Sequence, residues 1–230
     1  MSRRRSSRAS EAGLLRGCCF GLVVLGILLA FSLFVGVRAL AAPDLGSAPG
    51  GPSHGSSEVL IAAELAGSAG TQLIAGEHAV LVLSERDLTV LAQANNPSPD
   101  RFRNPQARIR NGQVVVSANT SVGPFGTTAV VNLQLLFSNS NGQVQVTAQP
   151  VSYDVGTLPV PDWLATQLAP SGGKTLNLTH LFTGNPPLEA LAQTIECVAI
   201  MPDGVHVSFH RPLATPDPFR CTSAAAANGV

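Results

Sequence analysis

The chain has 230 residues, of which 45% are hydrophobic and 12% charged, and its formal net charge at pH 7 is zero. This length allows one domain of ordinary size beside terminal segments. The balanced charge excludes the strongly basic surface that is typical of nucleic-acid-binding proteins. Uncharged polar side chains must therefore cover most of the surface.

The stretch from Gly17 to Val37 contains no charged residue. A bilayer core about 30 Å thick requires about 20 apolar residues in a helix, so we expect residues 17–37 to form a transmembrane anchor. The arginines that flank this stretch are Arg3, Arg4, Arg5, Arg8 and Arg16 before it and Arg38 after it. The positive-inside rule then predicts a single-pass protein of the cell membrane, with residues 1–16 as a basic cytoplasmic tail and the remainder extracytoplasmic.

A secretory signal is the alternative to an anchor. Ala39-Leu40-Ala41 has the small-x-small form that precedes a signal cleavage site. Apolar regions of signals usually have about 7–15 residues, and the longer stretch here favours an uncleaved anchor. Both alternatives place the rest of the chain outside the membrane.

Three further regions follow from composition. Residues 38–57 are rich in Gly, Pro, Ser and Ala, which predicts a flexible linker. Residues 58–221 are expected to form the extracytoplasmic domain, and residues 222–230 a disordered tail. Cys197 and Cys221 lie in the external part, where an oxidising compartment makes them a candidate disulfide.

The first elements of the domain are helical and then extended. The apolar spacing predicts a helix over residues 58–74 that is interrupted near Gly67 to Gly70. A short strand is expected over residues 78–83. Ser84 followed by Asp87 resembles a capping box, with Asp in place of Glu, and predicts a helix that ends near Asn95.

The middle of the chain has the period of strands. Asn111-Gly112 is a strong hairpin signal between residues 106–110 and 113–122. Further strands are expected over 127–137 and 143–155, with turns at 123–126 and 139–142. Polar and apolar residues alternate along them, which is typical of an antiparallel sheet with one buried face.

The last elements are expected to be a short helix over residues 162–168, a strand from Ile195, a turn at 202–204 and a strand over 205–210. No alternation of strands with helices appears in the meander. The sequence therefore predicts an α+β domain that contains an antiparallel sheet.

The motifs that carry a family resemblance lie between Ala79 and Arg211. They are Leu83-Ser84-Glu85-Arg86-Asp87-Leu88, the Asn-Gly hairpin and meander, Gly156-Thr157-Leu158-Pro159-Val160-Pro161, and Pro202-Asp203-Gly204-Val205. Together they resemble the YpmS-type and LmeA-type membrane-anchored bacterial extracytoplasmic proteins of the tubular lipid-binding (TULIP-like) superfamily. The resemblance implies a curved antiparallel sheet that wraps around a helix and leaves an apolar groove.

The resemblance also implies which side chains line such a groove. The candidates are Leu88, Leu91, Val114, Val116, Val131, Leu133, Leu135, Phe137, Val144 and Val146. Each buried CH₂ of an acyl chain would contribute about 0.8 kcal/mol, so no charge pair is required to hold it. The alternative interpretation is that these residues form the ordinary core of the sheet.

Two aromatic residues are candidates for membrane contact. Trp163 is the single tryptophan, and Phe125 lies in the expected turn Gly123-Pro124-Phe125-Gly126. Aromatic side chains are enriched where a protein meets the membrane interface. For Trp163 the alternative role is to cover one end of the core.

Motifs for common enzyme chemistry are absent from the sequence. It contains no Gly-x-Ser-x-Gly elbow, phosphate-binding loop or dinucleotide fingerprint, so we expect no catalytic residue, no metal and no cofactor. His206 and His210 lie on one strand face, but no third metal ligand is placed by spacing.

The expected function is binding of a lipid or lipid-linked precursor of the bacterial cell envelope, with transfer of that lipid as an extension. The expected partners are membrane lipid and envelope proteins. One alternative is a lipid hydrolase with a non-standard site that uses His180, His206 or Asp162. The other is a non-enzymatic envelope scaffold.

Overall fold

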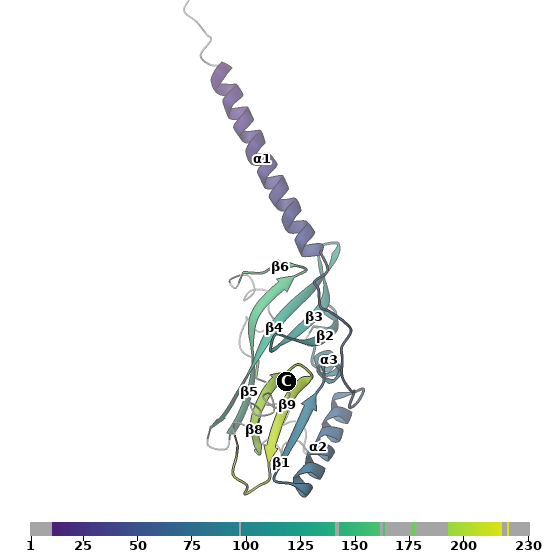
Figure 1. Cartoon of the computed structure of the whole chain (residues 1–230). Helices are drawn as coiled ribbons and strands as arrows, with labels where there is room; N and C mark the ends of the chain where they lie inside the picture. Colours follow the sequence, from purple (N-terminus) through teal and green to yellow (C-terminus); the bar gives the residue numbers. More distant parts are fainter. Residues whose placement is uncertain are drawn as a thin grey trace, which may run out of the picture.

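The computed structural model describes residues 11–96, 98–140, 143–161, 163, 176–177, 193–217 and 220, with side chains described from residue 25 onward except at 122, 139–140, 143–144 and 176–177. The fold is α+β, with antiparallel sheets and helices, as expected (Figure 1). The helix predicted over 162–168, apart from residue 163, lies outside the described residues, as do the turn residues 141–142 and the tail 222–230.

Helix α1 (Glu11–Leu40) extends away from the sheets (Figure 1). The large apolar side chains of its described half are exposed: Leu25, Ile27, Leu28, Leu29, Phe31, Leu33, Phe34, Val37 and Leu40. Among the described residues, no helix meets the length and hydropathy needed to span a bilayer. The transmembrane helix expected over residues 17–37 is thus not found in that part of the chain.

Helix α2 (Glu58–Ala75) is continuous, so the predicted interruption near Gly67 to Gly70 is wrong. Its buried residues include Ile61, Leu65 and Ala69, which follow one another at intervals of four. This spacing forms a single apolar stripe that packs against the sheet. Burial of that stripe outweighs the cost of about 1 kcal/mol for each glycine in a helix.

The smaller sheet has the strand order β1-β9-β8, with β1 (His78–Leu83), β8 (Ile195–Met201) and β9 (Gly204–His210). All pairs are antiparallel, and β1 pairs with β9 along its whole length. The strands predicted in these regions are confirmed. This sheet joins the beginning of the domain to its end, and α2 packs against β1.

The larger sheet is the expected meander, in the order β2-β3-β4-β5-β6. Its strands are β2 (Arg103–Arg110), β3 (Gln113–Val122), β4 (Phe125–Ser140), β5 (Gln143–Val155) and β6 (Leu158–Pro159), and β7 (Leu176–Asn177) pairs with β5. Asn111 and Gly112 both have positive φ, at 52° and 72°, which the tight β2–β3 hairpin requires.

Strand β5 contains a bulge opposite β4. Leu133 pairs with Pro150, but the adjacent Asn132 pairs with Ser152, so Val151 is an extra residue. An extra residue changes which face the following side chains occupy. Val146, before the bulge, is 3% exposed in the core, whereas Asp154, beyond it, lies on the opposite face.

The core lies between the two sheets and α2. Its buried members include Ile61, Leu81, Val114, Val146, Ile195 and Phe209, and the partly buried residues packed against it include Leu88, Val116, Leu133, Leu135 and Phe137. Helix α3 (Glu85–Ala94), the capped helix predicted after Ser84, is short and packs on β2.

Candidate functional site

Helix α3 begins with the capping box that the sequence predicts. The backbone N–H of Asp87 donates to Ser84 Oγ at 3.2 Å, and the backbone N–H of Ser84 donates to Asp87 Oδ2 at 3.0 Å. Both residues are 0% exposed. The cap also satisfies backbone donors that the first helical turn leaves without partners.

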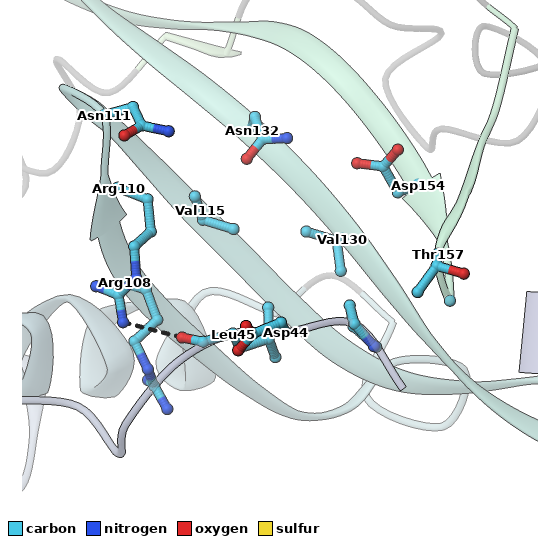
Figure 2. Close-up of a pocket in the computed structure, with 12 residues that line it drawn as sticks. Asp44, Leu45, Arg108, Arg110, Asn111, Val115, Val130, Asn132, Asp154 and Thr157 are labelled. Carbon is cyan, nitrogen blue, oxygen red and sulfur yellow. Dashed lines mark hydrogen bonds between the residues drawn. The ribbon is translucent and has the colours of Figure 1, made fainter. Parts of the chain in front are cut away.

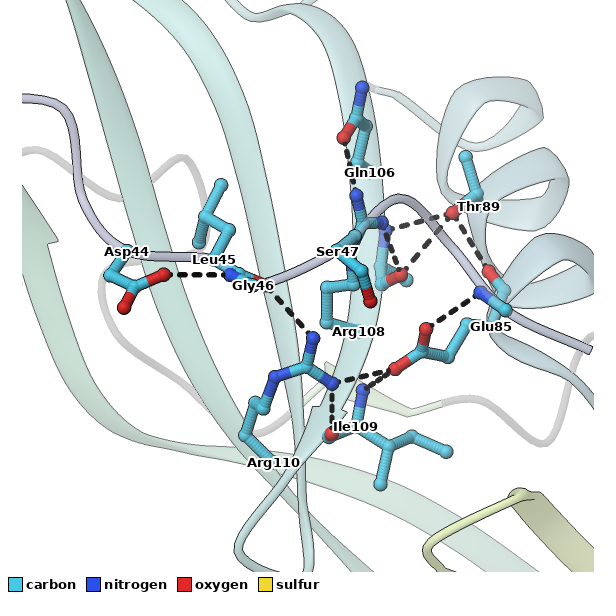
Figure 3. A network of polar contacts seen from close by, with 12 residues as sticks. Asp44, Leu45, Gly46, Ser47, Glu85, Thr89, Gln106, Arg108, Ile109 and Arg110 are labelled. Atoms are coloured by element: carbon cyan, nitrogen blue, oxygen red, sulfur yellow. Dashed lines mark hydrogen bonds and ion pairs between the residues drawn. The ribbon is translucent and has the colours of Figure 1, made fainter.

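Residues 41–57, which we call the strap, run from the end of α1 along α3 and β2 (Figures 1 and 3). The backbone N–H of Gly50 donates to Glu85 Oε2 at 2.9 Å, and that of His54 donates to Asp87 Oδ1 at 2.9 Å. Ser84 Oγ donates to the carbonyl of Pro52 at 2.5 Å. The composition predicted a flexible linker here, but the structure shows a segment held by hydrogen bonds to the start of α3.

Arginines of β2 hold the first half of the strap (Figure 3). Arg110 Nη1 lies 2.9 Å from Glu85 Oε1, and its Nη2 donates to the carbonyl of Leu45 at 2.9 Å. Arg108, 4% exposed, donates through Nε to the carbonyl of Ser47 at 3.0 Å. Glu85 thus accepts hydrogen bonds from both the strap and the sheet.

The carboxylates of Glu85 and Asp87 are held in their charged forms. Burial alone would raise the pKa of Glu85, but backbone hydrogen bonds from Ile109 and Gly50 and the charge of Arg110 lower it overall. Burial likewise opposes ionisation of Asp87, and hydrogen bonds from His54 and Ser84 lower its pKa overall. Both groups are therefore anionic at neutral pH, where they bind the strap most strongly.

A pocket of about 390 Å³ lies between the strap and the outer face of the larger sheet (Figure 2). Strand register explains its composition, because side chains on one face of a sheet alternate along each strand. Arg108 pairs with Val115, Val115 with Asn132, and Val130 with Asp154. The lining residues are Pro43, Asp44, Leu45, Arg108, Arg110, Asn111, Val115, Val130, Asn132, Asp154, Gly156 and Thr157.

Asp154 differs from the other carboxylates described above. Burial raises its pKa, and no described residue forms an ion pair or hydrogen bond with its side chain. Nearby, Asn132 donates through Nδ2 to Ser152 Oγ at 2.6 Å, and within the described chain no donor contacts its Oδ1. The pocket therefore contains acceptor oxygens that receive no hydrogen bond from the described residues.

The end of α1 contacts Thr127 of β4 and the turn between β5 and β6, which contributes Gly156 and Thr157 to the pocket lining. The backbone N–H of Thr157 donates to the carbonyl of Arg38 at 2.9 Å, and Thr127 Oγ1 donates to that of Ala39. Gly156 has φ of 61°, and a Cβ there would lie 2.3 Å from the carbonyl oxygen of Ala39. A glycine is thus required where α1 meets the turn between β5 and β6.

The residues predicted to line an apolar groove do not line this pocket. The described groove candidates of the larger sheet lie on its inner face, opposite the pocket, and two of them, Val114 and Val146, are buried in the core. Val116, Val131, Leu133, Leu135 and Phe137 are half-buried there, as are Leu88 and Leu91 of α3. The side chain of Val144 lies outside the described residues, and the groove itself stays a prediction.

Both predicted membrane-contact residues are exposed. Phe125 is the first residue of β4 rather than part of the turn, pairs with Val122 and is 58% exposed. Trp163 is 67% exposed. Cys197 is disulfide-bonded, but Cys221 lies outside the described residues, so that pairing stays a prediction.

Of the three residues named for an enzymatic site, the structure describes His206. His206 Nε2 lies 2.8 Å from Asp203 Oδ1, and among the described residues no group of His, Cys, Asp and Glu could hold a metal ion. His180 and Asp162 lie outside the described residues.

A buried polar network that the sequence analysis missed connects the strands of the smaller sheet. Glu196 Oε1 lies 2.8 Å from His78 Nδ1, Ser208 Oγ donates to Glu196 Oε2 at 3.0 Å, and the backbone N–H of Asp217 donates to Oε1. The carboxylate, rather than an imidazole, contacts the serine hydroxyl. The network thus joins β1, β8 and β9 through one carboxylate.

Comparison with known proteins gives no relative on which function could rest. No family model, curated protein or solved structure significantly matches the chain. The resemblance to the tubular lipid-binding superfamily thus stays a prediction.

The sequence analysis also missed the pocket. A signal was present in β2, where Gln106, Arg108 and Arg110 alternate with the buried Ala107 and Ile109. Polar residues at every second position indicate the face away from the core. What the sequence did not show is that the strap covers this face.

Proposed function

We propose that the protein is a membrane-anchored extracytoplasmic binding protein, and that its domain holds the apolar chain of a lipid or lipid-linked envelope precursor between the two sheets. The observation that supports this is the inner face of β4. Every second residue of β4 lies on that face, and four of these residues are apolar and only half-buried: Val131, Leu133, Leu135 and Phe137. This row offers apolar surface that the packed core does not fully cover.

The proposed anchor rests on the uncharged stretch of residues 17–37 and on α1. The described half of α1 exposes apolar side chains around the helix, including Phe31 at 64% and Leu33 at 70%. A helix that is apolar on all sides is typical of a membrane environment. The excess of arginine before the stretch supports a cytoplasmic N-terminus.

The proposed membrane contacts are Phe125 and Trp163. Phe125 lies at the hairpin end of β3 and β4, close to Thr127, which contacts the end of α1. Trp163 follows β6, whose preceding turn contacts α1. With α1 in the bilayer, this end of the sheet faces the membrane interface, where aromatic side chains are favoured. We therefore propose that both rings dock on the lipid surface.

Native mass spectrometry with lipid extraction tests the proposal on the full chain purified in detergent. The expected result is a stoichiometric phospholipid or isoprenoid lipid. The Leu135→Glu variant should lose it, because a carboxylate replaces an apolar contact on the inner face. Gln134→Glu, on the outer face of the same strand, is the matched control and should retain the lipid.

A non-enzymatic scaffold is the second candidate. It is favoured by the core, in which Val114 and Val146, two of the predicted groove residues, are 6% and 3% exposed. A wild-type protein that is free of lipid, and whose melting temperature does not rise when lipids are added, would reject the lipid-binding proposal in favour of the scaffold. Retention of a stoichiometric lipid rejects the scaffold.

A further inference from the structure

The strap-covered pocket has a composition that the proposed lipid groove does not explain. Its lining combines charged and amide side chains with apolar ones such as Val115 and Val130, and it lies on the outer face of the larger sheet, on the opposite side from the apolar row of β4. Its volume of about 390 Å³ lies within the range of about 300–1,000 Å³ for small-molecule sites.

The acceptors of the pocket lie on neighbouring strands and on the strap (Figure 2). Asp154 and Asn132 share the outer face of β5 and β4, where Asp154 lies opposite Val130, two residues from Asn132. Asp44 contributes a second carboxylate from the strap, and only its Oδ1 accepts a described hydrogen bond, from the backbone N–H of Gly46. These oxygens together suit a group with several N–H donors.

The other wall of the pocket is basic. Arg110 uses Nη1 and Nη2 for Glu85, Ile109 and Leu45, but its Nε has no acceptor among the described residues. A guanidinium has five N–H donors, so this side chain can also bind an anion. The pocket thus presents acceptors on β4 and β5 and a cation on β2.

We propose that this pocket binds a zwitterion that carries a primary ammonium and a phosphate, with Asp154 as the counter-ion of the ammonium and Arg110 as the partner of the phosphate. A primary ammonium has three donors for the oxygens of Asp154, Asn132 and Asp44. Quaternary ammonium ligands instead favour aromatic cages, and none of the described residues that line this pocket is aromatic.

The source of such a zwitterion can be an aminophospholipid headgroup or a soluble phosphoethanolamine-type compound. Thr157 lines the pocket and donates to Arg38 at the end of α1, which places the pocket next to the proposed anchor. The assignment to a lipid headgroup therefore rests on the proposed membrane attachment, whereas the ammonium site does not depend on it.

Titration of the full chain in phosphatidylcholine nanodiscs tests the site, with O-phosphoethanolamine, phosphocholine and inorganic phosphate as probes and calorimetry as the readout. O-phosphoethanolamine should bind, and the other two should bind at least about tenfold more weakly. Asp154→Asn should weaken O-phosphoethanolamine binding by about tenfold or more, while Asp100→Asn, an exposed carboxamide control, should not change it.

A melting curve separates loss of binding from loss of structure. Because burial disfavours the charge of Asp154, Asp154→Asn should melt at or above the wild-type temperature in the absence of ligand. Equal O-phosphoethanolamine affinity in wild type and Asp154→Asn, or no binding by a cooperatively melting wild type, overturns the proposal.

Nanodiscs that also contain phosphatidylethanolamine test the source. A lipid headgroup in the pocket should lower the apparent affinity for added O-phosphoethanolamine, and an unchanged affinity overturns the lipid assignment. The two proposals fail separately: Leu135→Glu should leave O-phosphoethanolamine binding intact, and Asp154→Asn should leave the co-purified acyl lipid intact.

Discussion

Asp87 contacts His54 through both carboxylate oxygens, although the two residues are 33 positions apart in the sequence. Oδ1 accepts the backbone N–H of His54, and Oδ2 lies 2.7 Å from its Nδ1. The same carboxylate also caps α3. One buried side chain therefore starts a helix and fixes the segment that leads from α1 into the domain.

Replacement of Asp87 by alanine should destabilise the domain by about 2–4 kcal/mol, because it removes a helix cap and leaves buried donors without an acceptor. Urea unfolding followed by circular dichroism measures this loss. Asp100→Ala, at an exposed position, should change the free energy of unfolding by less than about 0.5 kcal/mol. Equal stability of both variants would show that the cap and the strap contribute little.

Stability should fall as the solution is acidified. The pKa values of Glu85 and Asp87 are lower in the folded chain than the ordinary values of 4.5 and 3.8 for these side chains. Their contribution is therefore complete above about pH 5 and is lost as the pH falls below those values towards the folded-state pKa values. Asp154, whose pKa is raised, acts in the opposite direction, since its protonation relieves the cost of burial.

Urea midpoints at pH 7, 5, 4 and 3 measure this dependence. The Glu85→Gln/Asp87→Asn variant should be less stable than wild type at pH 7 and should lose less stability on acidification. Parallel curves for the two proteins would mean that other carboxylates cause the acid sensitivity.

The strap should exchange its amide hydrogens slowly at specific positions. The backbone N–H groups of Gly50 and His54 donate to carboxylates, so their exchange should be slower than that of an unstructured chain. Exchange measured by mass spectrometry or NMR should show this protection, and Glu85→Gln should reduce it at Gly50. Random-coil exchange rates at both amides in the wild type would support the flexible linker that composition predicted.

Local sequence signals predicted the elements whose causes are local. The capping box at Ser84 and the Asn111-Gly112 hairpin each depend on a few neighbouring residues, and both are observed. The continuity of α2 was not predictable in this way. Gly67 and Gly70 weaken the helix locally, but the buried stripe of Ile61, Leu65 and Ala69 packs against residues distant in sequence.

The site was less predictable than the fold. The strap has the composition of a linker, and its order arises from Glu85, Asp87, Arg108 and Arg110, which lie far along the chain. Likewise, the face that Asp154 occupies depends on a bulge that no local pattern indicated. Contacts between segments distant in sequence therefore decide where the pocket forms.

Glu196 should be essential for the smaller sheet. Its carboxylate contacts His78, Ser208 and the backbone of Asp217, so Glu196→Ala should leave buried polar groups unpaired and cost about 2–4 kcal/mol. Thermal melting under non-reducing conditions measures the loss. The control is Glu64→Ala, on the exposed face of α2, which should melt close to wild type.

Trp163 should report membrane contact, because it is the single tryptophan of the chain and is 67% exposed. The fluorescence of Trp163 is compared between the full chain in amphipol and the full chain in nanodiscs. In nanodiscs the emission maximum should lie at shorter wavelength, as expected for an indole at the membrane interface. Phe125→Ser should reduce this shift, because Phe125 is proposed to contact the membrane at the same end of the larger sheet as Trp163. An emission maximum that is unchanged in nanodiscs would place Trp163 away from the bilayer.

The bulge at Val151 makes β5 a strand of two halves with opposite amphipathicity. Before it, Val146 and Ala148 face the core; beyond it, Asp154 faces the strap-covered pocket. If Val151 instead paired regularly with Asn132, the following residues would shift by one place and Asp154 would turn towards the apolar layer. The one extra residue in β5 therefore decides that Asp154 lies on the pocket face of the sheet and not on its apolar face.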